Sequence, residues 1–405
     1  MRRAAVLPLS LLSCLLLAAH PSGAQTSFDV RNRDGISRNP AGVRLLLRTI
    51  EGKLTFHLFD TIPVELEFSS SRPSTYSIEF DEEMNFAGST HKFEIDPEDA
   101  VLLTPSELEI QGVICCESDR HYLSQRPTVF KRELTDYLRF ERAGTYRLFL
   151  TTRRVFKGPR DSDDFAASKI LLTSNILTLT ILPDDPEWDA ERLAETLQQL
   201  HDPHLKADYE ALEQEITNMS SETSQDLARA NRLDQTKFAQ AQKALNALDT
   251  REAIRERVNL MDMMSKEDIS LEREAGESGG GSVLWQPLLA STTRPDLVVA
   301  SMAARAAGPD FGVDYDYVDW WAKYIIVRDH TGLFRPFLDE AEHQKRLHSF
   351  AEYEIAAKQG VVLRLESLLV AKRGVARDIT ALTIKTVNAE IAYETKGKGQ
   401  SPASR

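Results

Sequence analysis

The apolar pattern of this chain changes its period near Pro183, and this change constrains the fold more than any other feature. Before that point the apolar residues come in short, often alternating runs separated by polar turn clusters. In the last run, Leu177, Leu179 and Ile181 alternate with threonines, which places the two kinds of side chain on opposite faces of a strand. We expect about eight strands without intervening helices, arranged as an antiparallel sandwich.

After Pro183 the spacing becomes helical. Leu193, Leu197 and Leu200 fall at positions i, i+4 and i+7, which predicts a helix that begins just past Pro186. From there the chain carries almost no strand signal. We therefore expect a multidomain chain, all-β and then all-α, whose two halves are separable units.

A helical hairpin is predicted within residues 237–261. Phe238 and Leu245 mark the apolar face of its first helix, and Ile254 marks that of its second. The sequence "LDT" interrupts the pattern between them. Either Asp249 or Thr250 is expected to cap the second helix.

The segment "FERAGTYRLFL" at 140–150 resembles the turn-and-strand of immunoglobulin-like sandwiches. In those folds a tyrosine after a tight turn tethers the corner by its hydroxyl group, and Gly144 and Tyr146 match this pattern. The paired cysteines and the core tryptophan of antibody domains are absent. The resemblance implies an Ig-like antiparallel β-sandwich over residues 41–183; a simple hairpin with a glycine turn is the alternative.

The helical hairpin at 237–261 and the segment at 291–326 resemble HEAT-like repeats. In such repeats each helix pair leaves an apolar face that only stacking on a neighbour can bury. The resemblance implies a HEAT-like α-helical region over 184–394, followed by a disordered tail at 395–405. Two longer helices, expected near 335–358 and 361–394, depart from the repeat pattern, so an irregular helical bundle is the alternative.

The first 24 residues have the pattern of a secretory signal peptide. Two arginines precede an apolar run at 4–19, and Ser22 and Ala24 supply the small residues of a cleavage site. Alternatively, "LLSC" resembles a bacterial lipobox, in which Cys14 would carry a lipid anchor. We expect an exported product, periplasmic or extracellular, without a membrane span.

Only two cysteines follow this segment, and they are adjacent. Cys115 and Cys116 are expected to be small apolar residues of a strand, with a strained vicinal disulfide or a redox role as the alternative. The formal net charge of −13 argues against a nucleic-acid partner, because phosphates require clustered lysine and arginine.

The segment "GESGGGS" at 276–282 matches the G-x-S-x-G pattern of a nucleophile elbow. That site requires a buried strand before the serine and a helix directly after it. Ser278 instead follows a charged stretch and precedes three glycines, so we interpret the segment as a flexible linker. We predict no catalytic residue, no cofactor and no metal site in this chain.

The acidic and aromatic segment "DYDYVDWW" at 314–321 is the one candidate contact site. Asp314, Asp316, Trp320 and Trp321 could bind a sugar, Ca²⁺ or a protein partner. The favoured interpretation is a helix start, because acids suit the positive end of a helix and aromatic side chains supply packing area.

The two architectures predict an exported, non-enzymatic protein-interaction or scaffold protein whose partner is a protein of unknown identity. This step is an analogy from fold to role. The alternative is a carbohydrate- or envelope-polysaccharide-binding protein that uses the tryptophans near 320. An unrecognised hydrolase is a third hypothesis.

Overall fold

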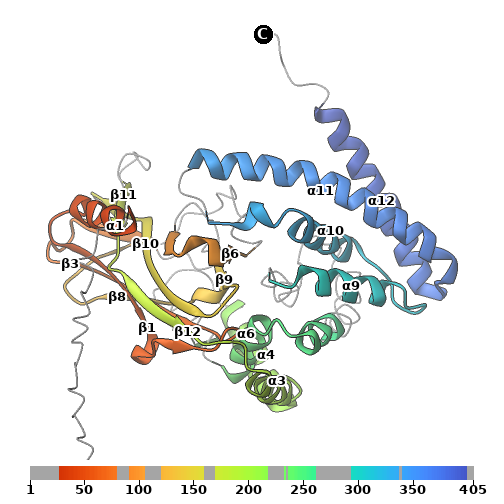
Figure 1. Ribbon diagram of the computed structural model, residues 1–405, viewed down its shortest axis with the longest axis horizontal. Coiled ribbons are helices and arrows are strands. Elements are labelled where there is room, and N and C mark those ends of the chain that lie inside the picture. Colours follow the sequence, from red (N-terminus) through yellow and green to blue (C-terminus); the bar gives the residue numbers. More distant parts are fainter. Residues whose placement is uncertain are drawn as a thin grey trace, which may run out of the picture.

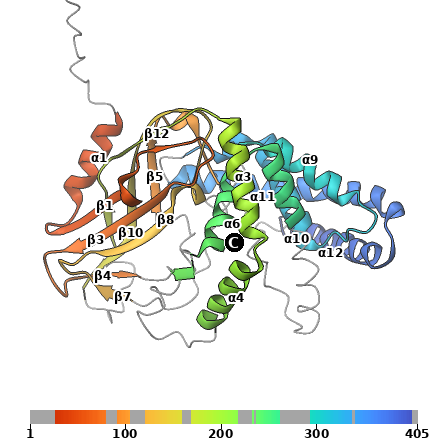
Figure 2. The same cartoon turned by 90° about the horizontal axis from the view of Figure 1, so that it is seen from below.

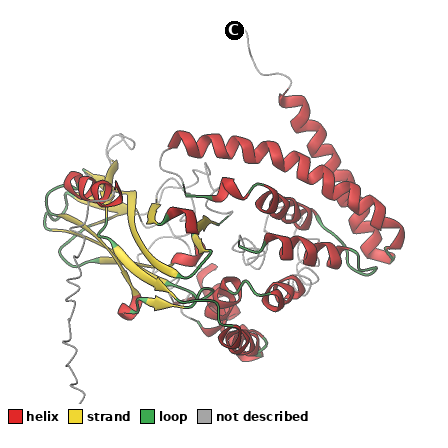
Figure 3. Cartoon of the chain, in the orientation of Figure 1, coloured by secondary structure: helices red, strands yellow, loops and turns green. Residues whose placement is uncertain are grey.

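The computed structural model describes residues 27–79, 91–104, 120–158, 169–217, 232–233, 236–260, 293–336 and 340–398. Strands fill the first half of the chain and helices fill the second, as the change of period predicts (Figure 3). The signal segment, the cysteine pair at 115–116 and the glycine-rich segment at 276–282 lie outside the described residues.

Twelve strands occur among the described residues, more than the sequence suggested (Figure 1). They are β1 (Val43–Thr49), β2 (Thr55–Phe56), β3 (Pro63–Ser70), β4 (Tyr76–Glu79), β5 (His91–Asp96), β6 (Val101–Leu103), β7 (Arg120–Tyr122), β8 (Thr128–Glu133), β9 (Leu138–Phe140), β10 (Gly144–Lys157), β11 (Lys169–Thr173) and β12 (Leu177–Ile181).

The strands form a small sheet, a large sheet and a short ribbon. The small sheet has the order β1-β3-β8, and the ribbon pairs β6 with β9. The large sheet has the order β2-β12-β10-β4-β7, with β5 and β11 also paired to β10. All pairs among the described strands are antiparallel except β12 with β2.

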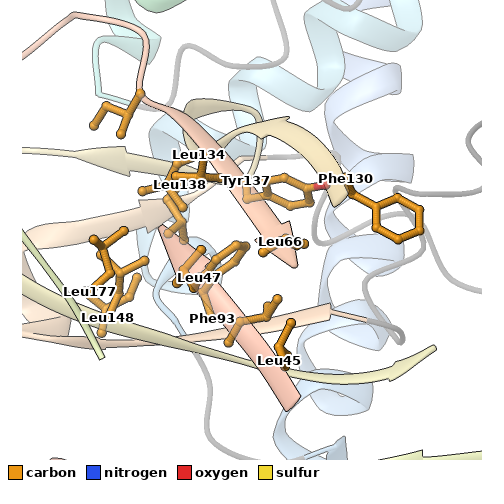
Figure 4. Close-up of a cluster of buried hydrophobic side chains, with 14 of the residues drawn as sticks. Leu45, Leu47, Leu66, Phe93, Phe130, Leu134, Tyr137, Leu138, Leu148 and Leu177 are labelled. Carbon is orange, nitrogen blue, oxygen red and sulfur yellow. The ribbon is translucent and has the colours of Figure 1, made fainter. Parts of the chain in front are cut away.

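A common apolar core joins these sheets. Along β3, Val64, Leu66 and Phe68 are buried, whereas the glutamates between them face outward. The alternation predicted for β12 is confirmed, since its three apolar residues are buried and its threonines are exposed. Figure 4 shows Leu47 and Leu66 of the small sheet near side chains of the large sheet, within one buried cluster.

The predicted tyrosine tether is present at the start of β10. The Tyr146 hydroxyl donates a hydrogen bond to the Arg142 carbonyl at 2.7 Å, while its ring contacts Phe140 with centroids 4.6 Å apart. This bond closes the turn that precedes the longest strand.

One helix of the first half was not predicted. Helix α1 (Ser27–Arg38) lies against β11 and β5, on the side of the β-rich region away from the other helices (Figures 1 and 2). Phe28 is buried against Phe149, and the Asn32 amide donates to the Ser174 carbonyl at 2.9 Å.

The second half contains eight α-helical segments of at least ten residues among its described residues. They are α3 (Pro186–Leu200), α4 (Pro203–Thr217), α6 (Lys237–Ala247), a segment at 251–260, α9 (Pro295–Ala306), α10 (Tyr315–Asp329), α11 (Glu340–Leu368) and α12 (Gly374–Lys398).

Polar caps begin several of these helices. The Asp185 carboxylate accepts from the Glu187 and Trp188 amides at 3.1 and 3.3 Å, and Pro186 occupies the first turn of α3. The Thr250 hydroxyl accepts from the Ala253 amide at 3.2 Å. Thr250 is therefore the cap of the segment at 251–260.

The break expected near residue 360 does not occur. Helix α11 runs through Gly360 to Leu368, because Ala357, Val361 and Leu365 continue a buried face across the glycine. That burial outweighs the cost of about 1 kcal/mol for a glycine inside a helix. The turn comes later, at Gly374, whose φ of 47° suits a residue without a side chain.

Side chains of the β-rich region pack into the apolar clusters of the helical region where the two regions meet. Leu102 of β6 belongs to the core of the helical region, and Phe59 belongs to the cluster formed by α3, α4 and α6. The His57 ring stacks on Trp188 with centroids 4.3 Å apart. These contacts join the two regions in the intact chain; that residues 25–183 and 184–405 fold as separable units stays a prediction.

Two arginines, the buried Arg139 and the partly exposed Arg335, add polar contacts to this junction. The Arg139 guanidinium of β9 donates to the carbonyls of Asn246 and Ala247 at 2.8 and 3.3 Å. Arg335 donates to the carbonyls of Asp99 and Val101 at 3.0 and 3.2 Å.

No described helix is long and apolar enough to cross a membrane.

Candidate functional site

The predicted contact residues all lie in the first two turns of α10 or at its cap. Asp314 caps this helix, and its carboxylate accepts from the Tyr317 amide at 2.8 Å. Asp316 lies in the first turn; its residue as a whole is exposed, but partial burial of its carboxyl group and the charge of Asp319 raise its pKa. This arrangement agrees with the favoured interpretation of the segment as a helix start.

The two tryptophans do not form a common aromatic platform. Trp321 is only 1% exposed and lies in the helical core, with its ring near Tyr317 and the Arg364 guanidinium. Trp320 is half-buried, and the Lys323 ammonium lies 4.4 Å from its ring centroid. The expectation of a ligand contact is corrected for Trp321, because a buried ring has no face open to a sugar.

Helix α10 instead contributes to an ion network that links three helices. The Lys358 ammonium of α11 lies 2.8 Å from Asp319 of α10, 3.0 Å from Glu354 and 3.0 Å from Glu390 of α12. Lys323 adds a second cation to Asp319 at 2.9 Å. We call these five residues the three-helix ion network.

Burial and charge act against each other in this network. Burial alone would lower the pKa of Lys358, but Asp319 and Glu354 outweigh it and hold that pKa well above its usual value. Burial likewise opposes the effect of Lys323 and Lys358 on Asp319, whose pKa is nevertheless lowered. Both residues are charged at neutral pH, so the network holds α10, α11 and α12 together.

A tyrosine extends the network. The Tyr315 hydroxyl donates to Glu390 at 2.6 Å, and burial together with this bond raises the pKa of Tyr315 to about 12. The phenol therefore stays protonated at neutral pH and serves as a hydrogen-bond donor.

The most exposed apolar side chains of the described residues lie beyond this network, on α11, α12 and the turn between them. Six of the ten large apolar side chains that are exposed belong to this part, and the five most exposed are all among them. Val370 is 89% exposed and Tyr393 is 81% exposed. The six are Tyr353, Leu363, Val370, Val375, Leu382 and Tyr393.

Three of these residues share one face of α12. Val375, Leu382 and Tyr393 are separated by seven and eleven residues, which are nearly whole numbers of helical turns. We call this surface the arm face; it spans about 27 Å of helix. Figure 1 shows α11 along one side of the helical region and α12 at its end, on the side away from the β-rich region.

The sequence alone did not reveal the arm face. Helix α12 carries two apolar stripes, and the other one, which includes Ile384, Val387 and Ile391, is buried. Helical spacing predicts both stripes equally, so only the packing of α12 on its neighbours distinguishes the buried stripe from the exposed one.

No protein-family model matches this chain, and no curated protein matches it. The assignment of a role therefore depends on the geometry of the described residues.

Proposed function

We propose that this chain is an exported, non-enzymatic protein-interaction or scaffold protein that presents the arm face to a protein partner. The observation that carries the proposal is the concentration of the five most exposed apolar side chains on α11, α12 and their turn. Exposed apolar side chains gathered in one region favour a protein contact, whereas scattered ones need no explanation.

The chemistry of the arm face suits a protein partner. Tyr393 offers an aromatic ring with a polar hydroxyl group, a combination enriched at the centres of protein interfaces. Leu382 and Val375 supply aliphatic area on the same side of the helix. A partner that covers this face would remove apolar surface from water, which is the main favourable term in most associations.

The arm face is also held in a fixed position. The three-helix ion network and the buried stripe of α12 fix that helix against α10 and α11. A surface that is ordered before binding loses less conformational freedom when the partner arrives.

The finer features of the fold support the same role by analogy. The Tyr146 tether favours an Ig-like sandwich, and the contacts between consecutive helices, such as α9 with α10 and α11 with α12, favour a HEAT-like or bundle-like region. Both architectures recur as interaction surfaces in exported proteins. Export itself rests on the signal pattern at 1–24.

A capture experiment tests the proposal. The mature chain, beginning at residue 25, would serve as bait in the native envelope fraction, alongside the variants Leu382→Lys and Tyr393→Ser. The matched control is Leu171→Lys, which changes an exposed apolar residue of β11. All three changes lie on the surface and should leave the circular dichroism spectrum and melting temperature unchanged.

We expect the two arm-face variants to capture at least tenfold less of a partner that wild type and the control capture in equal amounts. Equal capture by all four proteins would contradict the proposal. Size-exclusion chromatography with light scattering would show whether the partner is a second copy of the chain.

A further inference from the structure

A pocket of about 600 Å³ lies at the junction of the two regions. Its walls come from the segment around β2 and the start of β3, from the end of β8, and from helices α3 and α6. We call it the junction pocket. Its volume is in the range of sites that hold small organic molecules.

Basic side chains outnumber acidic ones among the described residues that line the junction pocket. The bases come from five positions and the acids from three. This excess stands out because the whole chain is acidic, with a formal net charge of −13. The bases are Lys53, Lys131, Arg132, Arg192 and Lys243.

Arg132 is the decisive residue of this set. On β8 it pairs with Val64 of β3, and it lies two residues after Phe130, so its side chain shares the core-facing side of the strand. Its guanidinium lies 5.6 Å from the Phe130 ring centroid, and its Nη1 donates to the Lys131 carbonyl at 2.7 Å.

The remaining donors of this guanidinium are not satisfied. Nε and Nη2 of Arg132 are buried and have no hydrogen-bond partner among the described residues. Buried donors almost always have a hydrogen-bond partner. The free-energy cost of a buried donor without a hydrogen bond is greatest when the group is charged. Nε and Nη2 of arginine form a fork that matches two oxygens of one oxyanion. In Arg132 both atoms are closed to solvent, so the side chain has to turn toward the pocket before this fork meets an oxyanion.

Lys53 and Arg192 also line the pocket and can contribute to the binding of an anion. Lys53 pairs with Asp60 at 2.9 Å and is more than half exposed, whereas Arg192 of α3 pairs with Glu195 at 3.1 Å. These surface pairs are weak in water, so both cations can also turn toward an anion. Ile50 and Phe56 provide an apolar wall for the rest of a ligand.

We propose that the junction pocket binds a phosphate group, free or carried on a small organic molecule, with Arg132 as its principal contact. The excess of basic side chains favours a dianion over a singly charged carboxylate. Because Arg132 belongs to the β-rich region and Arg192 to the helical region, such a ligand would bridge the two. This inference is independent of the arm face.

The test measures binding to the mature full-length chain at low ionic strength. Inorganic phosphate and phenyl phosphate are the two phosphate probes, and benzoate is the monoanionic control. Thermal unfolding and titration calorimetry report stability and affinity. We expect both phosphate probes to raise the melting temperature saturably; tighter binding of phenyl phosphate would identify an ester rather than the free ion as the better ligand.

Three variants locate the site. Arg132→Gln should weaken phosphate binding at least tenfold without lowering the melting temperature of the ligand-free protein, because its guanidinium has unsatisfied donors there. Arg192→Gln, at the rim, should weaken binding two- to fivefold. Arg44→Gln, which changes an exposed arginine of β1, should bind as wild type does.

Several outcomes would overturn the proposal. They are the absence of saturable binding of either phosphate probe to wild type, binding of benzoate as tight as that of phenyl phosphate, and unchanged affinity in Arg132→Gln. If Arg132→Gln does not fold, unchanged affinity in Arg192→Gln has the same consequence.

Discussion

Replacing Lys358 by methionine should destabilise the helical region strongly. The side chain of Lys358 is 6% exposed, and its ammonium lies within 3.0 Å of three carboxylates. Methionine keeps much of the length of the side chain but leaves Asp319, Glu354 and Glu390 without their central cation. Removing one partner of a buried ion pair typically costs about 3–5 kcal/mol, and we expect a loss in that range at pH 7.

The loss should depend on pH in a defined direction. In wild type the pKa of Asp319 is lowered by its lysine partners against the effect of burial, so its contribution is present above its unfolded pKa and disappears as pH falls through the folded value. In the variant the three carboxylates repel one another when charged, and protonation relieves that repulsion. The difference between variant and wild type should therefore be largest at neutral pH and shrink toward pH 4.

Urea unfolding, followed by circular dichroism at pH 7 and pH 4, measures the loss of unfolding free energy in the variant and how that loss changes with pH. The matched control is Lys385→Met, which changes an exposed lysine of α12 and should shift stability by no more than about 0.5 kcal/mol. A loss below about 1 kcal/mol at pH 7, or a loss that persists unchanged at pH 4, would refute the assigned role of the network.

Three further predictions concern stability. Tyr146→Phe removes the hydrogen bond to the Arg142 carbonyl and should cost about 1 kcal/mol in thermal unfolding. Burial and Asp184 raise the pKa of Asp189 to about 7, so the stability of wild type should fall as pH rises from 4 to 7. The variant Asp189→Asn should not show this fall, and it should be about 2 kcal/mol more stable than wild type at pH 8. Arg139→Met leaves two buried carbonyls without their donor, which should cost about 2–4 kcal/mol and speed limited proteolysis at the junction.

Features set by local sequence were predictable. The alternation of β12 is explained by its own side chains, and the Tyr146 tether joins residues only four positions apart. Asp314 caps α10 through a bond to an amide three residues later. In each case the interacting groups lie close in the sequence, so no knowledge of the rest of the fold was needed.

Features set by distant partners were not predictable. Gly360 continues a helix because the neighbouring side chains are buried against α10 and α12. Trp321 is buried for the same reason, although its neighbour Trp320 remains half-exposed. The bases of the junction pocket come from segments far apart in the chain, such as Lys53 and Lys243, so no motif announces them.

The side-chain exchange at the junction bears on how this chain could be inherited. Leu102 lies in the first half of the sequence yet completes the core of the helical region, and Phe59 does the same for α3 and α6. Recombination at residue 183 would join this β-rich region to the helices of another protein, which would lack the apolar surroundings that Leu102 and Phe59 require. The two halves should therefore evolve together. A change in the residues around Leu102 or Phe59 should be accompanied by a change in that side chain.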